Sequence, residues 1–307
     1  GVQWLDVALG GLFPNDVILI GAHTGAGKTE LSTLIAMRNA SAGKRVHYFA
    51  LEAEEAEIER RIKYKLLVSL ASASVQYPAI REKINYLDWY AGKLEGIFGR
   101  LEDAAEAMLA KRYATLNTFY RVREFKGETL ERDILAIQAT TDLIIIDHLH
   151  YIDSDDTNEN RGYKEIVKRI RDVALSVGKP IVVVAHLRKQ DRSRPRIVPT
   201  LDDFHGTSDI VKIATKAVIL SPAFDQSPPF SEPWKFPTYI HPAKCRADGQ
   251  RTKYTAIVNF DVRTNTYGDD FRIGKVTSDG AKWEEKVSDP PAWIRTEPTR
   301  EPGSDDQ

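Results

Sequence analysis

The chain has 307 residues, 42% of them hydrophobic, which is enough to bury one large core. Its 43 basic residues nearly cancel its 44 acidic residues, so any affinity for nucleic acid must come from a local patch and not from the net charge. The single cysteine, Cys245, excludes a disulfide framework and a zinc site made of cysteines, which fits a reducing cytoplasm. No apolar run approaches the ~20 residues of a membrane span. We therefore expect a cytoplasmic protein with no membrane partner.

Short β-branched runs alternate with longer helical patterns along most of the chain. The runs are residues 17–20, 46–50, 143–146, 181–185 and 217–220. This alternation predicts an α/β fold with a mostly parallel sheet flanked by helices. Residues 239–243 and 254–260 follow with little room for a helix between them. They predict an antiparallel hairpin that extends the sheet at its C-terminal side.

The first motif follows the first of these runs. Residues 22–29 read AHTGAGKT and precede a helix-compatible segment. A glycine-rich loop between a strand and a helix turns backbone N–H groups towards phosphates, Lys28 adds a cation near the β- and γ-phosphates, and Thr29 offers its hydroxyl to Mg²⁺. We predict that the chain binds ATP with Mg²⁺ here; the alternative is a chance match in a surface loop. The predicted nucleotide-binding residues are Ala22, Gly25, Ala26, Gly27, Lys28 and Thr29, with Ala22 standing where the usual pattern has glycine.

A candidate for activating water follows the second run. Glu52 comes just after residues 46–50, where its carboxylate can face a γ-phosphate across the carboxyl edge of the sheet. Glu54, Glu55, Glu57 and Glu59 follow, so Glu52 can equally belong to the solvated face of an acidic helix. Position alone leaves both interpretations open.

The stretch 78–108 has a different pattern. Its apolar residues recur at alternating steps of four and three, as in a helical seam. Gly92, Gly96 and Gly99 interrupt it, and each costs a helix roughly 1 kcal/mol relative to alanine, so we expect a broken or closely packed helix. Two alternatives stay open: helices that cover the sheet, or a protruding arm for a partner or neighbouring subunit.

Two further strand ends carry polar groups. The run 143–146 ends in Asp147, which in a P-loop domain holds the Mg²⁺ hydration shell together with Thr29. His186 follows the run 181–185 and is similarly placed to contact the γ-phosphate. The alternatives are that Asp147 is an ordinary turn aspartate and that His186 is a core histidine that caps a strand.

Taken together, these segments resemble the RecA-like motor domain of the DnaB-type hexameric replicative helicases, which have bacterial, phage and plasmid members. The resemblance covers residues 4–260 and is weaker at about 66–118, where the chain has extra helical sequence. It implies a RecA-like P-loop ATPase motor domain over residues 1–287, with a helical insertion at about 66–118. The tail 288–307 contains four prolines, and we expect it to be disordered. The matching segments, in the family's order, are 5–6, 10–12, 49–52, 142–149, 185–187 and 244–246.

The resemblance also implies roles for single residues. Glu52 matches the family's catalytic glutamate, and His186 matches its γ-phosphate sensor. Lys244 and Arg246 match a Lys-x-Arg motif whose two cations reach the γ-phosphate of the neighbouring subunit. Because such cations act only across a subunit interface, the match implies a homo-oligomeric ring, most simply a hexamer.

The family's DNA-contact loop matches His205, Gly206, Thr207 and Ser208, where histidine replaces the usual arginine. Small residues expose backbone N–H groups to a phosphate. Five cations within nine residues offer a second phosphate track, although a solvated basic loop is an equally common use of such a segment. These cations are Arg188, Lys189, Arg192, Arg194 and Arg196.

The resulting hypothesis is an ATP-driven, ring-forming translocase or helicase on single-stranded DNA that acts in DNA replication, with a helicase loader or primase as a further partner. The rival is a RecA-like regulatory or recombination-mediator ATPase that acts on a protein. A small-molecule kinase is disfavoured, since nothing in the sequence resembles a substrate lid.

Overall fold

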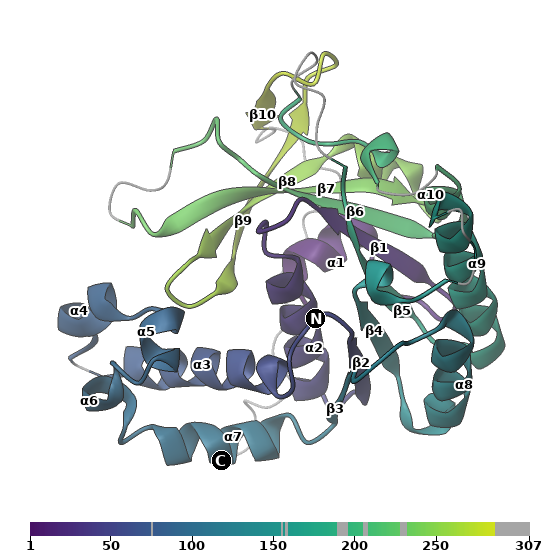
Figure 1. Ribbon diagram of the computed structural model, residues 1–307. Helices are drawn as coiled ribbons and strands as arrows, with labels where there is room; N and C mark the ends of the chain where they lie inside the picture. The colour runs from purple at the N-terminus through teal and green to yellow at the C-terminus, as the bar shows by residue number, and fades with distance from the viewer. Residues whose placement is uncertain are drawn as a thin grey trace, which may run out of the picture.

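The computed structural model describes residues 1–74, 76–154, 156, 159–188, 196–204, 208–227 and 232–285. Its centre is one ten-stranded sheet (Figure 1). The strands are β1 (Val17–Ala22), β2 (Val46–Ala50), β3 (Leu116–Tyr120), β4 (Leu143–Asp147), β5 (Ile181–His186), β6 (Lys216–Pro222), β7 (Lys235–Cys245), β8 (Thr255–Asp261), β9 (Thr266–Val276) and β10 (Trp283–Glu285). They are arranged in the order β10-β9-β8-β7-β6-β1-β5-β4-β2-β3.

The sheet has a parallel and an antiparallel half. All pairs from β6 through β1, β5, β4 and β2 to β3 are parallel, whereas β7, β8, β9 and β10 join by antiparallel pairs. The expected α/β fold with a C-terminal antiparallel hairpin is confirmed. All five expected parallel strands form, and β3, β9 and β10 are additional.

Helices cover both faces of the parallel half, because the side chains of each strand alternate between the two faces. Ile18 and Ile20 pack in one core cluster with α1 (Gln3–Leu9), α2 (Lys28–Ser41) and α3 (Glu57–Ser72). Val17 and Leu19 pack in the other, with α8 (Gly127–Ile137) and α9 (Glu159–Val177), and α10 (Ser208–Ile213) adds to the same side. The short 3₁₀ helices are η1 (Arg81–Lys83), η2 (Gln138–Thr140), η3 (Leu149–Tyr151), η4 (Leu201–Asp203) and η5 (Gly249–Lys253).

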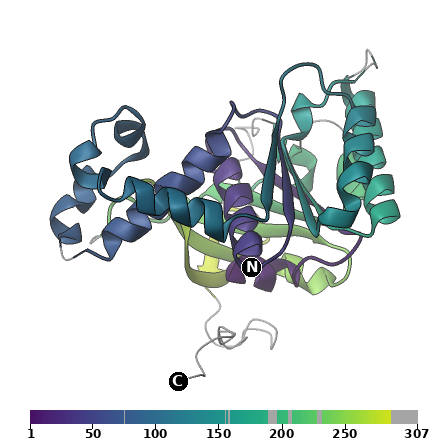
Figure 2. The same ribbon diagram turned by 90° about the horizontal axis from the view of Figure 1, so that it is seen from below.

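The predicted helical seam at 78–108 is broken into short pieces. They are α4 (Tyr77–Ile80), η1, α5 (Tyr86–Tyr90), α6 (Glu95–Phe98) and α7 (Glu102–Arg112). Gly92 has φ 76°, a left-handed conformation that ends the helix before it. Figures 1 and 2 show these pieces packed beside α3 and extending past the sheet, which favours the protruding arm. The helical pieces end at Arg112, and Leu116 already belongs to β3, inside the limits expected for the insertion.

The C-terminal tail and a membrane span were the subjects of two further expectations. The tail 288–307 lies outside the described residues. Within the described ranges, no helix combines the length and apolar character that crossing a bilayer requires.

Candidate active site

The phosphate loop joins β1 to α2. Gly25 and Gly27 have φ 79° and 81°, so both lie in the left-handed region that favours glycine. The Lys28 ammonium curls back over the loop and donates to the carbonyls of Ala22, at 3.2 Å, and His23, at 3.0 Å. Burial lowers the pKa of Lys28, while the nearby carboxylates of Asp147 and Glu52 oppose this shift. The loop thus holds a largely buried cation above the end of β1.

A strand from the antiparallel half braces this loop. The Tyr267 hydroxyl of β9 donates to the carbonyl of Ala26 at 3.1 Å and lies 3.4 Å from that of Gly27. A side chain at position 27 would place its Cβ 2.5 Å from this hydroxyl, so glycine is required there for space as well as for its backbone angle. Burial raises the pKa of Tyr267 well above its ordinary value, so it stays a neutral donor.

A cavity of about 470 Å³ opens beside the loop. The loop and the start of α2 form one wall, and the carboxyl ends of β2, β4 and β5 form another. The turn between β8 and β9 closes a third side. This is the crevice at the carboxyl edge of a parallel sheet where α/β folds bind their ligands. The lining residues are Thr24, Gly25, Gly27, Lys28, Thr29, Glu30, Glu52, Ala53, Glu57, Arg61, Asp147, His186, Phe260 and Asn265.

Asp147 ends β4 at the bottom of this cavity. Its Oδ2 accepts from the Tyr48 hydroxyl at 2.7 Å and from Ser32 at 3.3 Å. Its Oδ1 is buried and has no hydrogen-bond partner among the described residues. Burial raises the pKa of Asp147, whereas the hydrogen bond from Tyr48 and the nearby Thr29 hydroxyl oppose this shift. A buried carboxylate oxygen without a donor, beside a threonine hydroxyl, is the oxygen donor set that fits Mg²⁺.

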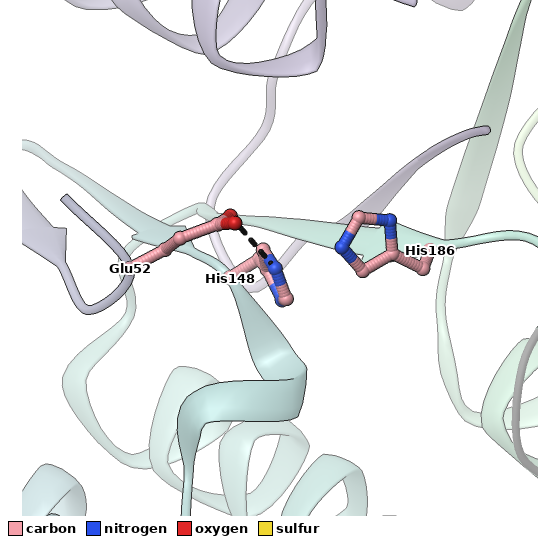
Figure 3. A group of neighbouring side chains, drawn as sticks. All are labelled: Glu52, His148 and His186. Atoms are coloured by element: carbon pink, nitrogen blue, oxygen red, sulfur yellow. Dashed lines mark ion pairs between the residues drawn. The ribbon is translucent and has the colours of Figure 1, made fainter. Parts of the chain in front are cut away.

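Glu52 lies in the bend after β2 and before α3, which begins at Glu57. It is therefore not part of an acidic helix face. Its Oε2 lies 2.8 Å from Nε2 of His148, and His186 at the end of β5 faces the same spot (Figure 3). Contact with His148, opposed by burial, lowers the pKa of Glu52, so its carboxylate is ionised at neutral pH. The fold thus brings together Lys28, Thr29, Asp147, Glu52 and His186.

The two cations of the Lys-x-Arg motif lie elsewhere. Lys244, near the end of β7, donates to the carbonyls of Val211 at 2.6 Å and Lys212 at 3.0 Å, at the end of α10. Arg246 follows β7 and is exposed. Neither residue lines the cavity of its own chain.

Most of the expected DNA-contact residues lie outside the described part of the chain: Lys189, Arg192, Arg194, His205, Gly206 and Thr207. The start of α10 includes Ser208, whose side chain is not described. Two flanking contacts are described: Leu187 forms an isolated bridge with Phe204, and the Arg188 N–H donates to the Asp203 carbonyl at 2.6 Å. The two candidate segments therefore start side by side, and the described end of the basic segment is Arg196.

Several residues of the site were not predicted. Tyr48 lies inside an apolar run and reads as core, although a buried tyrosine hydroxyl requires a partner. His148 directly follows Asp147, and that adjacency was the available signal. The ion pairs of Glu30 with Arg61 and Lys65 join α2 to α3 beside the cavity, across more than thirty residues.

This fold and loop define a P-loop nucleoside triphosphatase of the RecA-like class. The family described as DnaB-like helicase C terminal domain matches residues 1–224, and the chain belongs to this family. The chain is thus an NTP-hydrolysing helicase domain by family, as the sequence resemblance predicted. A comparison with curated proteins finds no match.

Solved structures share the fold at low sequence identity. A structure described as an ATPase domain is 15% identical with a TM-score of 0.68, over 87% of this chain and 89% of that one. A DnaB-like replicative helicase, described with its interactions with primase, is 16% identical with a TM-score of 0.69, and the match covers 87% of this chain and 60% of that one. A KaiC-like protein from the archaeon Pyrococcus horikoshii OT3 is 14% identical with a TM-score of 0.54, over 87% of this chain and 95% of that one.

Proposed function

We propose that the chain is the motor of a ring-forming translocase that moves on single-stranded DNA and hydrolyses ATP at subunit interfaces. The observation that carries this proposal is that the proposed catalytic groups lie in two separate places. The cavity holds the phosphate loop and the carboxylates of Glu52 and Asp147, whereas the two cations of the Lys-x-Arg motif lie outside it, near the end of β7. In a DnaB-like domain, this separation favours an ATP site in which a neighbouring subunit supplies the two cations.

Within one subunit, each residue has a separate task. The loop N–H groups and Lys28 bind the β- and γ-phosphates, and Thr29 and Asp147 hold Mg²⁺. The metal would neutralise charge on the phosphates when bound. Glu52, ionised and half-exposed to the cavity, orients and deprotonates the attacking water, and His186 contacts the γ-phosphate.

Between subunits, Arg246 acts as an arginine finger. Its planar, delocalised charge suits the spread charge of a phosphoryl-transfer transition state. Lys244 already binds the end of α10, which directly follows the candidate DNA loop. The Lys-x-Arg segment is thereby joined to that loop, which supports coupling of hydrolysis to movement of DNA in a hexameric ring.

The DNA track consists of the segments around His205 and from Arg188 to Arg196, which start side by side. Because the net charge is only −1, binding depends on these local cations. A primase or helicase loader is the further partner we propose, in line with the similarity to a replicative helicase described with primase.

The test is the ATPase rate of the purified chain with and without single-stranded DNA, with Lys28→Ala as the control. We expect DNA to stimulate turnover and Lys28→Ala to abolish tight ATP binding, because it removes the cation facing the phosphates. A rate indifferent to DNA but raised by a protein partner would replace the translocase with a regulatory ATPase. Unchanged ATP affinity in Lys28→Ala would refute the phosphate site itself.

A further inference from the structure

The proposed base lies beside a buried histidine. His148 has a 2% exposed side chain, and its Nε2 lies 2.8 Å from Oε2 of Glu52, which is 45% exposed (Figure 3). The ring packs edge-on against His186, with centroids 4.3 Å apart, and against Tyr151, at 4.9 Å. The imidazole is therefore held by packing on its neighbours, whereas the carboxylate is the exposed partner of this contact.

The other ring nitrogen determines what Nε2 can do. The Nδ1 of His148 accepts from the backbone N–H of His150 at 3.3 Å. A neutral imidazole with an accepting Nδ1 carries its proton on Nε2. The nitrogen nearest Glu52 is thus a donor, 2.8 Å from a carboxylate oxygen.

This tautomer argues against a resident metal. Glu52, His148 and His186 place one ligand atom each within 4.8 Å of one another, a spacing compatible with a cation. A histidine that ligates a metal through Nε2 normally donates from Nδ1 to a neighbouring oxygen. Here Nδ1 of His148 accepts instead, so Nε2 is better suited to donate to the Glu52 carboxylate than to bind a transition metal.

We propose that His148 is a positioning residue for Glu52: its Nε2–H binds one carboxylate oxygen and leaves the other to face the attacking water. This inference rests on the proposed role of Glu52 as the base. The contact is short but not aligned as a hydrogen bond in the structure. Such catalytic contacts are often poorly aligned without substrate and tighten in the substrate complex. The half-exposed Glu52 has the freedom to turn.

Two matched amide variants test this role. The amide of His148→Gln reaches the position of Nε2, whereas that of His148→Asn reaches only the position of Nδ1. We expect His148→Asn to lower kcat by about 10- to 100-fold, the effect of a misplaced reacting group, with the KM for ATP changed less than about twofold because substrate binding does not involve Nε2. His148→Gln should restore most of the loss. Equal activities of the two variants, or a loss confined to KM, would overturn the proposal.

A double-mutant cycle shows whether His148 acts through Glu52. In a Glu52→Gln background, His148→Asn should cause no further loss of kcat, because the positioned group is already absent. A full additional loss would mean that His148 acts independently. If Glu52→Gln alone hydrolyses ATP at the parent rate, the proposed base fails, and that result is distinct from a failure of positioning.

Thermal unfolding of each variant separates loss of fold from loss of position. Co²⁺ titration of the parent chain gives a second readout, since Co²⁺ bound by histidines absorbs visible light. Absorption that disappears in His148→Gln would show an unprotonated Nε2 bound to metal and would overturn the proposal.

Discussion

The two halves of the sheet differ in burial and in the chemistry they carry. In the parallel half, β1 and β4 are buried along their whole length, and the one ionisable side chain in these two strands is Asp147, where β4 ends. In the antiparallel half, only Tyr267 and Gly274 of β9 are buried, and the strand contributes the Tyr267 side chain to the site. The parallel half holds the groups proposed to act within a subunit, and the antiparallel half carries those proposed to act on the next one.

The largest expected effect comes from removing the cation that follows β7. Arg246→Ala should bind ATP yet lose about three to five orders of magnitude in turnover, the contribution of an arginine finger supplied in trans. Steady-state ATPase kinetics and nucleotide binding on the assembled protein measure this. An Arg246→Ala variant as active as the parent, or a protein that stays monomeric, would remove the ring mechanism.

Mixing variants sharpens the same test. Arg246→Ala subunits retain Glu52, and Glu52→Gln subunits retain Arg246, so mixed rings contain some interfaces with both groups intact. These rings should recover part of the ATPase activity that neither variant shows alone. Absence of recovery would be weaker evidence against the ring mechanism than a fully active Arg246→Ala variant, since a ring motor can require every subunit to be competent.

The next effect lies in the parallel half. Glu52→Gln should leave ATP binding nearly intact and lower turnover by about two to four orders of magnitude, the usual contribution of a positioned general base. Binding by a fluorescent ATP analogue and single-turnover hydrolysis separate the two quantities. Hydrolysis at the parent rate would show that Glu52 has no catalytic role.

The smallest effect concerns stability and compares a histidine from each half. Burial lowers the pKa of His241 in β7 to about 4, and it also lowers the pKa of His47 in β2. Below the unfolded pKa of about 6.5, the unfolded chain binds protons that the folded chain does not, so stability present above that pH is lost as pH falls towards 4. We expect the free energy of unfolding to fall by roughly 1 to 3 kcal/mol on account of His241 over this window.

Urea unfolding at pH 7 and pH 5 measures this loss. His241→Gln should flatten the pH dependence more than His47→Gln, because burial lowers the pKa of His241 to about 4 and its Nδ1 lies 2.9 Å from the hydroxyl of the buried Thr255. Equal flattening in both variants would show that the two halves protect their histidines alike.

The parallel half was the more predictable from sequence. All of its strands except β3 are largely apolar runs, and the topology then brings their carboxyl ends together, which places Asp147 and His186 at the cavity. Glu52 had two interpretations until the start of α3 at Glu57 separated it from the helix. The additional strands β3 and β9 were missed because they lie near the edges of the sheet and mix exposed with buried residues, so no apolar run marks them. The contact of His148 with Glu52 depends on packing that no local pattern contains.

The Tyr267 hydroxyl has a mechanical consequence for a ring. It holds the phosphate loop from β9, and β9 is hydrogen-bonded through β8 to β7, the strand that leads into Arg246. The register places Tyr267 opposite Phe260 and Phe260 opposite Phe236, at the far end of β7 from Arg246. A displacement of the arginine end would therefore reach the phosphate loop only along the whole length of β7. In the proposed ring, this chain of strands would link the neighbour's nucleotide to the geometry of the subunit's own phosphate loop.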